Sequence, residues 1–490
     1  MLNCGAVINI ESLMDIEGLS IYVLDSHRPI HKKNIKSKSV FILTNEVIDE
    51  DENLEEKIED TPKTSDDAEE GEADEEKGEE EGDDEEIKDN EKEKEENRIT
   101  STYGSCISML LYDLASRLNK VTNELLWLGI IGFTDQIVHN KIDSGRWKVE
   151  MKAWRDEVYR LNGITIDYSQ KSGTFIQCGD EYRFMAYRHW NLYDSMYHSS
   201  FIAARLSIWK SSNSRNGLKK MLAKMGLPLE QCLQPYTSMN MKVKSELPKK
   251  LKLYADQFNL HDITFESFVK SSGFTKHLSA ADAVYSLSGL LEARTSSFSA
   301  ENSENLQTTG DPNADGENSW KENFTTAYAS LSNSSSAWEL VMTGIKHAIE
   351  LQKEIVKQGG SLIENKHISL VGSFRYAWLN TTTCPSYSLP LFCNSLALTK
   401  LALFLQQVFE QMKKPVKPII IGALNEEKDV YLIVAVSTSP NSNKFGYIFE
   451  KAAIDTGAKI ALHTFDSSIV EIARSDAKIF IEHLHYGLSV

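Results

Sequence analysis

The chain has 490 residues, of which 41% are hydrophobic, and a mean hydropathy of −0.35, values typical of a soluble globular protein with roughly two to four domains. Its six cysteines show no paired spacing, which argues against a disulfide framework or a zinc site. No stretch reaches the roughly 18 apolar residues of a bilayer span, and residues 1–12 lack the pattern of a signal peptide, so we expect an intracellular protein without a membrane segment.

The net charge of −18 is concentrated in one segment. Residues 49–96 contain 28 acidic and 6 basic residues, a local charge of −22, so the remaining residues sum to +4. Like-charge repulsion and the lack of apolar residues predict that residues 49–98 form a disordered insert, because burial could not offset the entropy lost on ordering. A solubilising spacer and a regulatory segment are both open interpretations.

The residues on either side of the insert, 1–48 and 99–180, predict one α/β domain. Ile21–Leu24 and Val40–Leu43 are short apolar runs rich in β-branched and aromatic residues. Runs of this kind favour parallel strands that are buried on both faces.

Helices are predicted after the insert. Apolar residues recur at helical spacing over 107–118, and Leu125–Ile131 is apolar nearly all round, as expected at the centre of a domain. A further helix is predicted over Arg146–Leu161, with Gly163 as its cap.

The second half of the chain predicts a helical domain, a loop and a second α/β domain. Residues 181–293 are expected to be mostly helical, punctuated by Gly226-Leu227-Pro228 and Leu247-Pro248, and the polar residues 294–325 to form a disordered loop. Residues 326–490 predict the second α/β domain. Its expected elements are a helix over Trp338–Gln358 that ends at Gly359-Gly360, a helix within Leu391–Phe409, strands at Ile368–Val371, Ile419–Gly422 and Val430–Val436, and a last helix over Ser475–Leu484.

A polar motif, Asp25-Ser26-His27-Arg28-Pro29, follows the first predicted strand, where ligands bind in open α/β sheets. It resembles the Asp-His-His-x-Pro signature of the DHH phosphoesterase superfamily, which includes the RecJ nucleases and holds a two-metal site. Ser26 stands in place of the first histidine, and a hydroxyl is a poorer metal ligand than an imidazole. Asp25 and His27 could hold one ion weakly, but we favour a structural role in which Asp25 caps the following turn and His27 makes a buried hydrogen bond.

The same motif, with arginine in the variable place, is similar to that of the cell division control protein 45 family. Further blocks match this family in its order along nearly the whole chain: Leu2–Ala6, Leu125–Gln136, Tyr187–Ser195, Ala203–Trp209, Met225–Leu229, Lys444–Ala453 and Phe465–Ile472. The family begins with one more strand-helix-strand segment, so we expect either a loss in this lineage or an incorrect start codon.

The resemblance implies an α/β fold: an inactive DHH-phosphoesterase-like, RecJ-like sheet domain with a helical inserted domain and a C-terminal DHHA1-like α/β domain. It implies a nuclear, non-catalytic activator of the eukaryotic replicative DNA helicase that joins the minichromosome maintenance hexamer and GINS and meets replication initiation factors. Asp25, His27 and Asp135 become vestigial metal-site positions, and neither a cofactor nor a bound metal is expected. No phosphate loop for an ATPase is present in the sequence.

With chemistry disfavoured, function is expected at surfaces. Residues 205–252 carry a local charge of +9. The basic patch comprises Arg205, Lys210, Lys219, Lys220, Lys224, Lys242, Lys244, Lys249, Lys250 and Lys252. We rank contact with a partner subunit first, a solvated face second and single-stranded or fork DNA third, because few aromatic residues could stack on bases.

Two other functions stay open. One is a residual metal-dependent phosphoesterase or exonuclease acting on single-stranded DNA. The other is an acidic, histone-chaperone-like protein in which the insert itself is the functional element.

Overall fold

The computed structural model describes residues 1–14, 16, 18–46, 100–163, 174–210, 214–273, 276–292, 314–462 and 466–487. The predicted acidic insert and the first part of the predicted loop, residues 294–313, lie outside the described residues.

The N-terminal strands pair in parallel, as predicted. β1 (Ile21–Val23) lies beside β3 (Val40–Ile42), and the two short helices are α1 (Ile10–Leu13) and α2 (Lys32–Lys36). Ala6, Ile10, Val23 and Val40 form a small core on one face of the sheet. The prediction of burial on both faces is wrong, because Tyr22 and Phe41 stack on the other face with 55% and 42% of their surface exposed.

Helices follow at the positions predicted from periodicity. They are α4 (Ile107–Arg117), α5 (Asn123–Val138) and α6 (Ser144–Asn162), and β4 (Thr102–Tyr103), which precedes them, pairs with β2 (His27–Arg28). Gly163 caps α6 with a φ of 81°, as expected of a glycine at a helix end.

The middle of the chain is less helical than predicted. A three-stranded antiparallel sheet is formed by β5 (Thr174–Tyr182), β6 (Thr264–Ser272) and β7 (Lys276–Ser279). α12 (Ala280–Leu291) then packs in one apolar cluster with α5 and α15. Helical periodicity did not reveal β6, because its partner β5 lies about 90 residues earlier in the chain.

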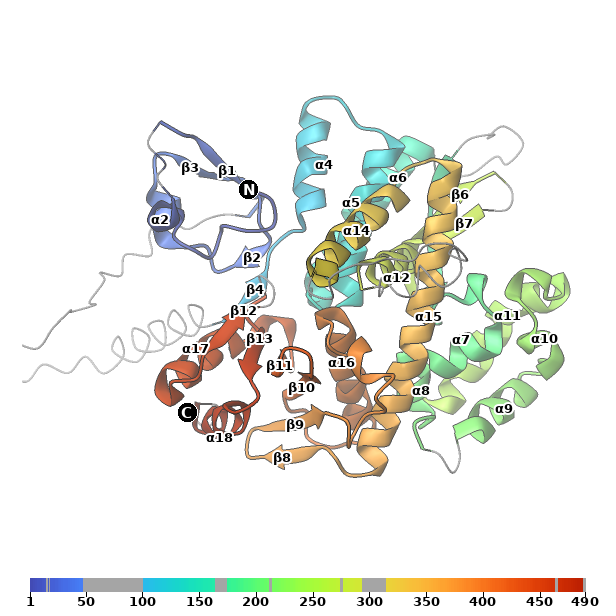
Figure 1. Cartoon of the computed structure of the whole chain (residues 1–490). Coiled ribbons are helices and arrows are strands. Elements are labelled where there is room, and N and C mark those ends of the chain that lie inside the picture. Colours follow the sequence, from blue (N-terminus) through green and yellow to red (C-terminus); the bar gives the residue numbers. More distant parts are fainter. Residues whose placement is uncertain are drawn as a thin grey trace, which may run out of the picture.

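In the sequence, a helical group separates β5 from β6, and it lies on the right of Figure 1. Its members are α7 (Leu192–His198), α8 (Ser200–Arg205), α9 (Ser214–Lys224), α10 (Leu229–Leu233) and α11 (Met241–Tyr254). Pro248 lies inside α11 and does not end it, which corrects the predicted break.

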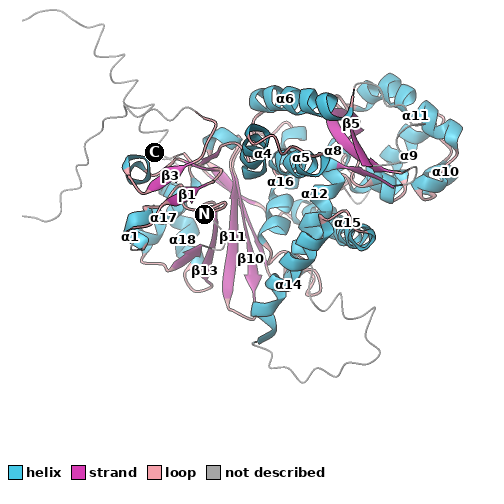
Figure 2. Ribbon diagram, turned by 90° about the horizontal axis from the view of Figure 1, so that it is seen from above, coloured by secondary structure: helices cyan, strands magenta, loops and turns pink. Residues whose placement is uncertain are grey.

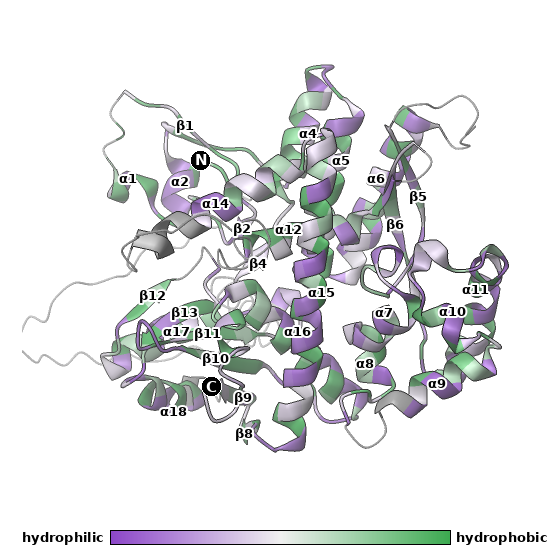
Figure 3. Cartoon of the chain, turned by 45° about the vertical axis from the view of Figure 1, so that its right-hand side comes forward, coloured by the Kyte–Doolittle hydropathy of each residue, from purple (hydrophilic) through white to green (hydrophobic). Residues whose placement is uncertain are grey.

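Two helices connect this half of the molecule to the C-terminal part. α14 (Ala314–Ser330) occupies residues predicted as loop, and its Asn323 and Ala327 are buried. α15 (Ser335–Glu364) runs along the molecule and carries both hydrophilic and hydrophobic residues (Figure 3). It does not end at Gly359-Gly360: a Cβ at these positions would meet the Phe404 ring at 2.6 Å and the Trp209 carbonyl oxygen at 2.8 Å, so both glycines allow close packing.

The C-terminal part is a six-stranded mixed sheet of order β12-β13-β11-β10-β9-β8. Its strands are β8 (Ser369–Val371), β9 (Phe374–Leu379), β10 (Ile419–Asn425), β11 (Val430–Val436), β12 (Ile460–Leu462) and β13 (Ile469–Ala473). α16 (Ser395–Gln411) packs in the apolar cluster on one face, while α17 (Phe445–Thr456) and α18 (Ala477–Gly487) pack in the cluster on the other (Figure 2). Residues 369–487 thus contain a mixed sheet with helices, in which β9, β12 and β13 were not predicted.

Within the described part of the chain, no helix is both long and apolar enough to cross a bilayer.

Candidate functional site

The Asp-Ser-His-Arg-Pro motif turns the chain directly after β1. Asp25 is buried, and its Oδ2 accepts a hydrogen bond from the Ala6 backbone N–H at 3.0 Å. Its Oδ1 accepts from the His27 backbone N–H at 3.1 Å and lies 2.6 Å from the His27 ring Nδ1. The aspartate therefore caps its own turn, and the histidine ring is held by it, as the structural interpretation predicted.

These contacts engage both carboxylate oxygens of Asp25 within the protein. Burial alone would raise its pKa, but the hydrogen bonds from His27 and Ala6 outweigh burial and lower the pKa below its ordinary value. The carboxylate is thus kept charged by internal donors that occupy both oxygens. The Ser26 hydroxyl donates to the Asn3 side-chain oxygen at 3.3 Å.

The third predicted position, Asp135, lies on α5. Its Oδ1 is 2.9 Å from His139 Nδ1, and its Oδ2 is 4.0 Å from Lys141 Nζ. Burial opposes ionisation, but His139 and then Lys141 lower the pKa of Asp135 well below its usual range. The Asp135 carboxylate therefore lies beside an imidazole ring and an ammonium group, although 42% of the side chain is exposed.

The structure brings two of the three positions to one cleft. His27 and Asp135 both line a cavity of about 350 Å³, whereas Asp25 is not part of its lining. An adjoining cavity of about 430 Å³ shares Asn3, Tyr103 and Lys141 with the first and extends to the C-terminal sheet.

A two-metal centre does not fit this cleft. In the part of the chain that the structure describes, no three His, Cys, Asp or Glu side chains are grouped so that they could hold an ion. The ammonium of Lys141 lies beside Asp135 and 5.1 Å from the Tyr103 ring centre, where a second cation would be repelled. The Tyr103 hydroxyl donates to Asp466 at 2.6 Å, so this ring links β4 to the C-terminal part.

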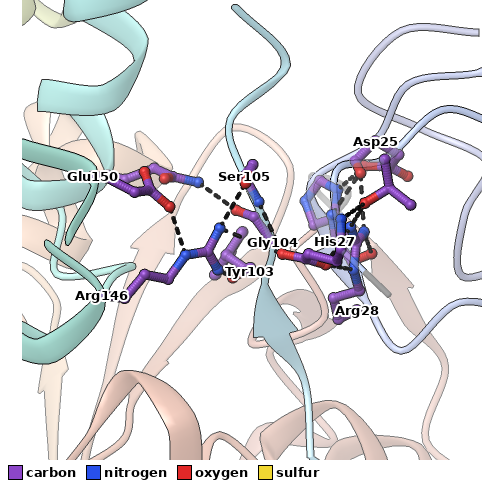
Figure 4. Close-up of polar contacts among 11 residues, drawn as sticks. Asp25, His27, Arg28, Tyr103, Gly104, Ser105, Arg146 and Glu150 are labelled. Carbon is purple, nitrogen blue, oxygen red and sulfur yellow. Dashed lines mark hydrogen bonds and ion pairs between the residues drawn. The ribbon is translucent and has the colours of Figure 1, made fainter. Parts of the chain in front are cut away.

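A polar network that the sequence did not predict lies next to the motif (Figure 4). Arg28 Nε donates to Glu46 Oε2 at 2.8 Å, and Glu46 Oε1 accepts from the Ser105 N–H at 3.2 Å. Arg146 of α6 pairs with Glu46 at 3.4 Å and donates to Glu150 at 2.7 Å. The network joins the chain on the two sides of the acidic insert, and no local sequence pattern signals a contact over 59 positions.

Comparison with known proteins shows which family the chain resembles. The family model described as CDC45 matches residues 1–101 and 94–487. The chain belongs to the CDC45 family. It is 35% identical to the cell division control protein 45 homolog of Dictyostelium discoideum over 415 residues, which are 78% of this chain and 61% of that protein.

Two further comparisons cover more of the sequence. The cell division control protein 45 homolog of Schizosaccharomyces pombe is 33% identical over 99% of this chain and 86% of its own length. The crystal structure of CDC45 from Entamoeba histolytica matches all of this chain and 84% of that one, with a TM-score of 0.66 and 24% identity, so it supports the fold. The family and the α/β fold expected from the motifs are thereby confirmed.

In this CDC45-family chain, the predicted basic patch lies on α8, α9 and α11 and at Lys210 after α8, and several of its members contact neighbouring residues. Lys224 donates to Gln257 at 2.9 Å, and Lys250 lies 3.0 Å from Glu246 and 3.3 Å from the Gly226 carbonyl oxygen. The patch is therefore partly neutralised and partly used in local packing.

The other members of the patch differ in their contacts and exposure. Arg205 lies 3.7 Å from the Phe201 ring centre, and Lys219 lines a groove of about 740 Å³ between the helical group and α15. Lys210, Lys220, Lys242, Lys249 and Lys252 are exposed. Lys244 is half-buried and donates to the Thr237 carbonyl oxygen at 3.0 Å.

Proposed function

We propose that the chain acts in DNA replication, in the nucleus, as a non-catalytic scaffold of the replicative helicase. Membership of the CDC45 family supports the role in DNA replication. The scaffold would join the minichromosome maintenance hexamer and the GINS complex and meet replication initiation factors, as the family resemblance implies. The whole fold is interpreted as an inactive DHH-phosphoesterase-like domain with a helical insert and a C-terminal DHHA1-like domain.

One observation carries the non-catalytic part of this proposal. Both oxygens of Asp25 are engaged by internal donors, and Asp135 is in contact with His139 and Lys141. Two-metal hydrolysis needs carboxylates that are free to clamp a pair of ions. A cleft whose carboxylates are already paired supports binding and positioning, and it disfavours hydrolysis.

The exposed lysines of α11 and the neighbouring helices support contact with a partner subunit. Lys249 and Lys252 are exposed, and α11 carries only Glu246 as an acidic residue. Such a surface suits an acidic patch on another protein, because charged surfaces guide association and set specificity.

Reconstitution tests the scaffold. Purified chain is mixed with the hexamer and GINS, and the assembled complex and its DNA unwinding are measured. We expect unwinding to depend on the chain, and a Lys249→Glu, Lys252→Glu double variant to assemble at least fivefold more weakly. A Lys451→Glu, Lys459→Glu double variant, which reverses two exposed lysines outside the helical group, is the control for net charge. Unwinding that is independent of the chain would refute the scaffold.

The enzymatic alternative has its own test. Manganese-dependent hydrolysis of single-stranded DNA is measured for the chain and for an Asp135→Ala variant. We expect no turnover above the variant's background. Hydrolysis that disappears in the variant would replace the proposed function with a metal-dependent exonuclease.

A further inference from the structure

A separate cavity, of about 260 Å³, lies on the face of the three-stranded sheet. We call it the tryptophan pocket and define it by Trp127 of α5, Lys270 of β6, Lys276 and Leu278 of β7, and Trp338 and Val341 of α15. In Figure 1, α5, α12, β6 and β7 gather at the N-terminal end of α15, where this pocket lies. α5 and α12 also line the cleft described above, so they separate the two cavities.

The strand register places the polar side chains of the pocket on one face of the sheet. Lys270 is opposite Leu278, and Ser272 is opposite Lys276 in the antiparallel pair β6–β7. Opposed residues, and residues two apart on one strand, share a face. Both lysines therefore stand beside an apolar floor, to which Leu278 contributes.

The pocket is cationic. Its lining includes two lysines and no aspartate or glutamate, although Glu124, next to the lining, accepts from the Asn333 side chain and attracts Lys270. Lys270 donates to the Asn333 side-chain oxygen at 2.8 Å and lies 5.8 Å from the Trp127 ring centre. Lys276 Nζ lies 5.5 Å from the Trp338 ring centre.

This arrangement keeps a positive charge close to apolar surface. Burial lowers the pKa of Lys270, which shows that desolvation of its ammonium is costly. The indole faces offset part of that cost through cation–π attraction, while an anionic ligand group would offset more of it.

We propose that the tryptophan pocket binds a short acidic segment of a partner protein. One apolar side chain of the segment packs on the floor between the two indoles. Flanking carboxylates of the segment lie beside Lys270 and Lys276. Charge complementarity selects this occupant, and the apolar floor gives the contact its affinity, since buried aromatic and aliphatic anchors dominate such interfaces.

Single-stranded nucleic acid fits the pocket less well. Bases bind such surfaces by stacking on free aromatic faces along a continuous basic groove. Here an ammonium group already lies near each indole ring, and two lysines do not make a track for a phosphate backbone. The inference does not rest on the proposed helicase scaffold, because peptide binding is measured on the isolated full chain.

Four fluorescein-labelled pentapeptides provide the probe, each with two aspartates on either side of a central Phe, Tyr, Leu or Ile. We expect at least one to bind the full chain with a Kd below about 100 µM in fluorescence anisotropy. The same peptide with a central Gly should bind at least tenfold more weakly. Lys276→Glu should also weaken binding at least tenfold, and Lys276→Met, which keeps the aliphatic stem against Trp338, should give a similar loss. Lys252→Glu, on the remote α11, should change the Kd by less than twofold.

Location is tested by fluorine NMR of the full chain with its eight tryptophans replaced by 5-fluorotryptophan. We expect the peptide to shift the resonances of Trp127 and Trp338, assigned by single Trp→Phe variants, and to leave the others in place. Three results would overturn the proposal: no peptide binding below about 1 mM, equal losses in Lys276→Glu and Lys252→Glu, or shifts confined to other tryptophans. Displacement of the peptide by oligothymidine from these two resonances would assign the pocket to nucleic acid instead.

Discussion

At the scale of single residues, Asp25 acts as an acceptor for the turn that follows β1. Its carboxylate accepts from Ala6 and His27 in a buried position. Asp25→Ala removes these bonds, and hydrogen bonds to a charged group contribute about 1.5–3 kcal/mol each. We expect local opening of the N-terminal segment to become easier by about 2–4 kcal/mol, because losses within one cluster are not additive. Hydrogen exchange of the His31 and Leu43 amides measures this local opening.

The paired control is Asp135→Ala. Asp135 lies on α5 and contacts His139 and Lys141, so its loss should leave the His31 and Leu43 amides unchanged. Equal protection in wild type and Asp25→Ala would mean that the carboxylate does not hold the turn and is available for another role.

The same residue sets a pH dependence. The pKa of Asp25 is lower in the folded chain than its ordinary value of 3.8. The unfolded chain therefore binds more protons near this pH, so the stabilisation by Asp25 is complete above 3.8 and is lost as the pH falls further. Exchange of the His31 amide should accelerate on acidification below that value more in wild type than in Asp25→Ala, after correction for intrinsic exchange. Parallel profiles would contradict this expectation.

At the scale of elements, the crossing of α12 and α15 depends on two glycines. A Cβ on Gly344 would lie 2.4 Å from the Ser286 carbonyl oxygen, and one on Gly289 would lie 2.3 Å from the Gly344 carbonyl oxygen. Gly344→Ala should lower the free energy of unfolding by about 1–3 kcal/mol, because the helices must move apart. This is the net loss that we expect after the gain of about 1 kcal/mol that alanine brings within a helix.

Thermal and denaturant unfolding measure this change. Gly179→Ala in β5 is the matched control, since a Cβ there meets no atom within 4 Å. If the two variants unfold alike, the close approach of α12 and α15 is not a constraint on stability.

Elements with a local sequence signal could be predicted, whereas elements that depend on distant contacts could not. The periodicity of α4, α5 and α6 and the apolar runs of β10 and β11 are local signals, and they predicted the elements correctly. The pair Gly359-Gly360 misled the prediction, because a glycine needed for close packing has the same local pattern as a glycine that ends a helix. β6 was missed for a related reason, since its pairing with β5 spans the whole helical group.

The residues of the candidate site were likewise predicted only in part. The motif after β1 and Asp135 were predicted from sequence blocks, and the structure places His27 and Asp135 at one cavity. Glu46 and Arg146 were not predicted, because their contacts join segments on opposite sides of the insert. The Lys270 and Lys276 pair likewise emerges only when β6 and β7 are in register.

At the scale of the whole molecule, charge is divided between residues 49–96, which carry −22, and the remaining residues, which carry +4. Glu46 lies outside residues 49–97. Its contacts with Arg28, Ser105 and Arg146 join the segment before residues 49–97 to the segment after them. Replacement of residues 49–97 by a short glycine-serine linker should therefore leave the melting temperature unchanged. It should also increase retention on a cation exchanger, because the net charge becomes positive.

Measuring helicase assembly shows whether the chain acts through its folded surfaces or through the acidic insert. A chain that acts through folded surfaces should still assemble with the hexamer and GINS after the replacement. Glu46→Ala in the same background should lower the melting temperature, because Arg28 and Arg146 lose a shared carboxylate at the point where the two segments meet. Loss of assembly with an unchanged melting temperature would make the acidic insert itself the functional element, as in a histone-chaperone-like protein. Retained assembly with a lower melting temperature in the Glu46 variant would place the insert outside both the fold and the interface.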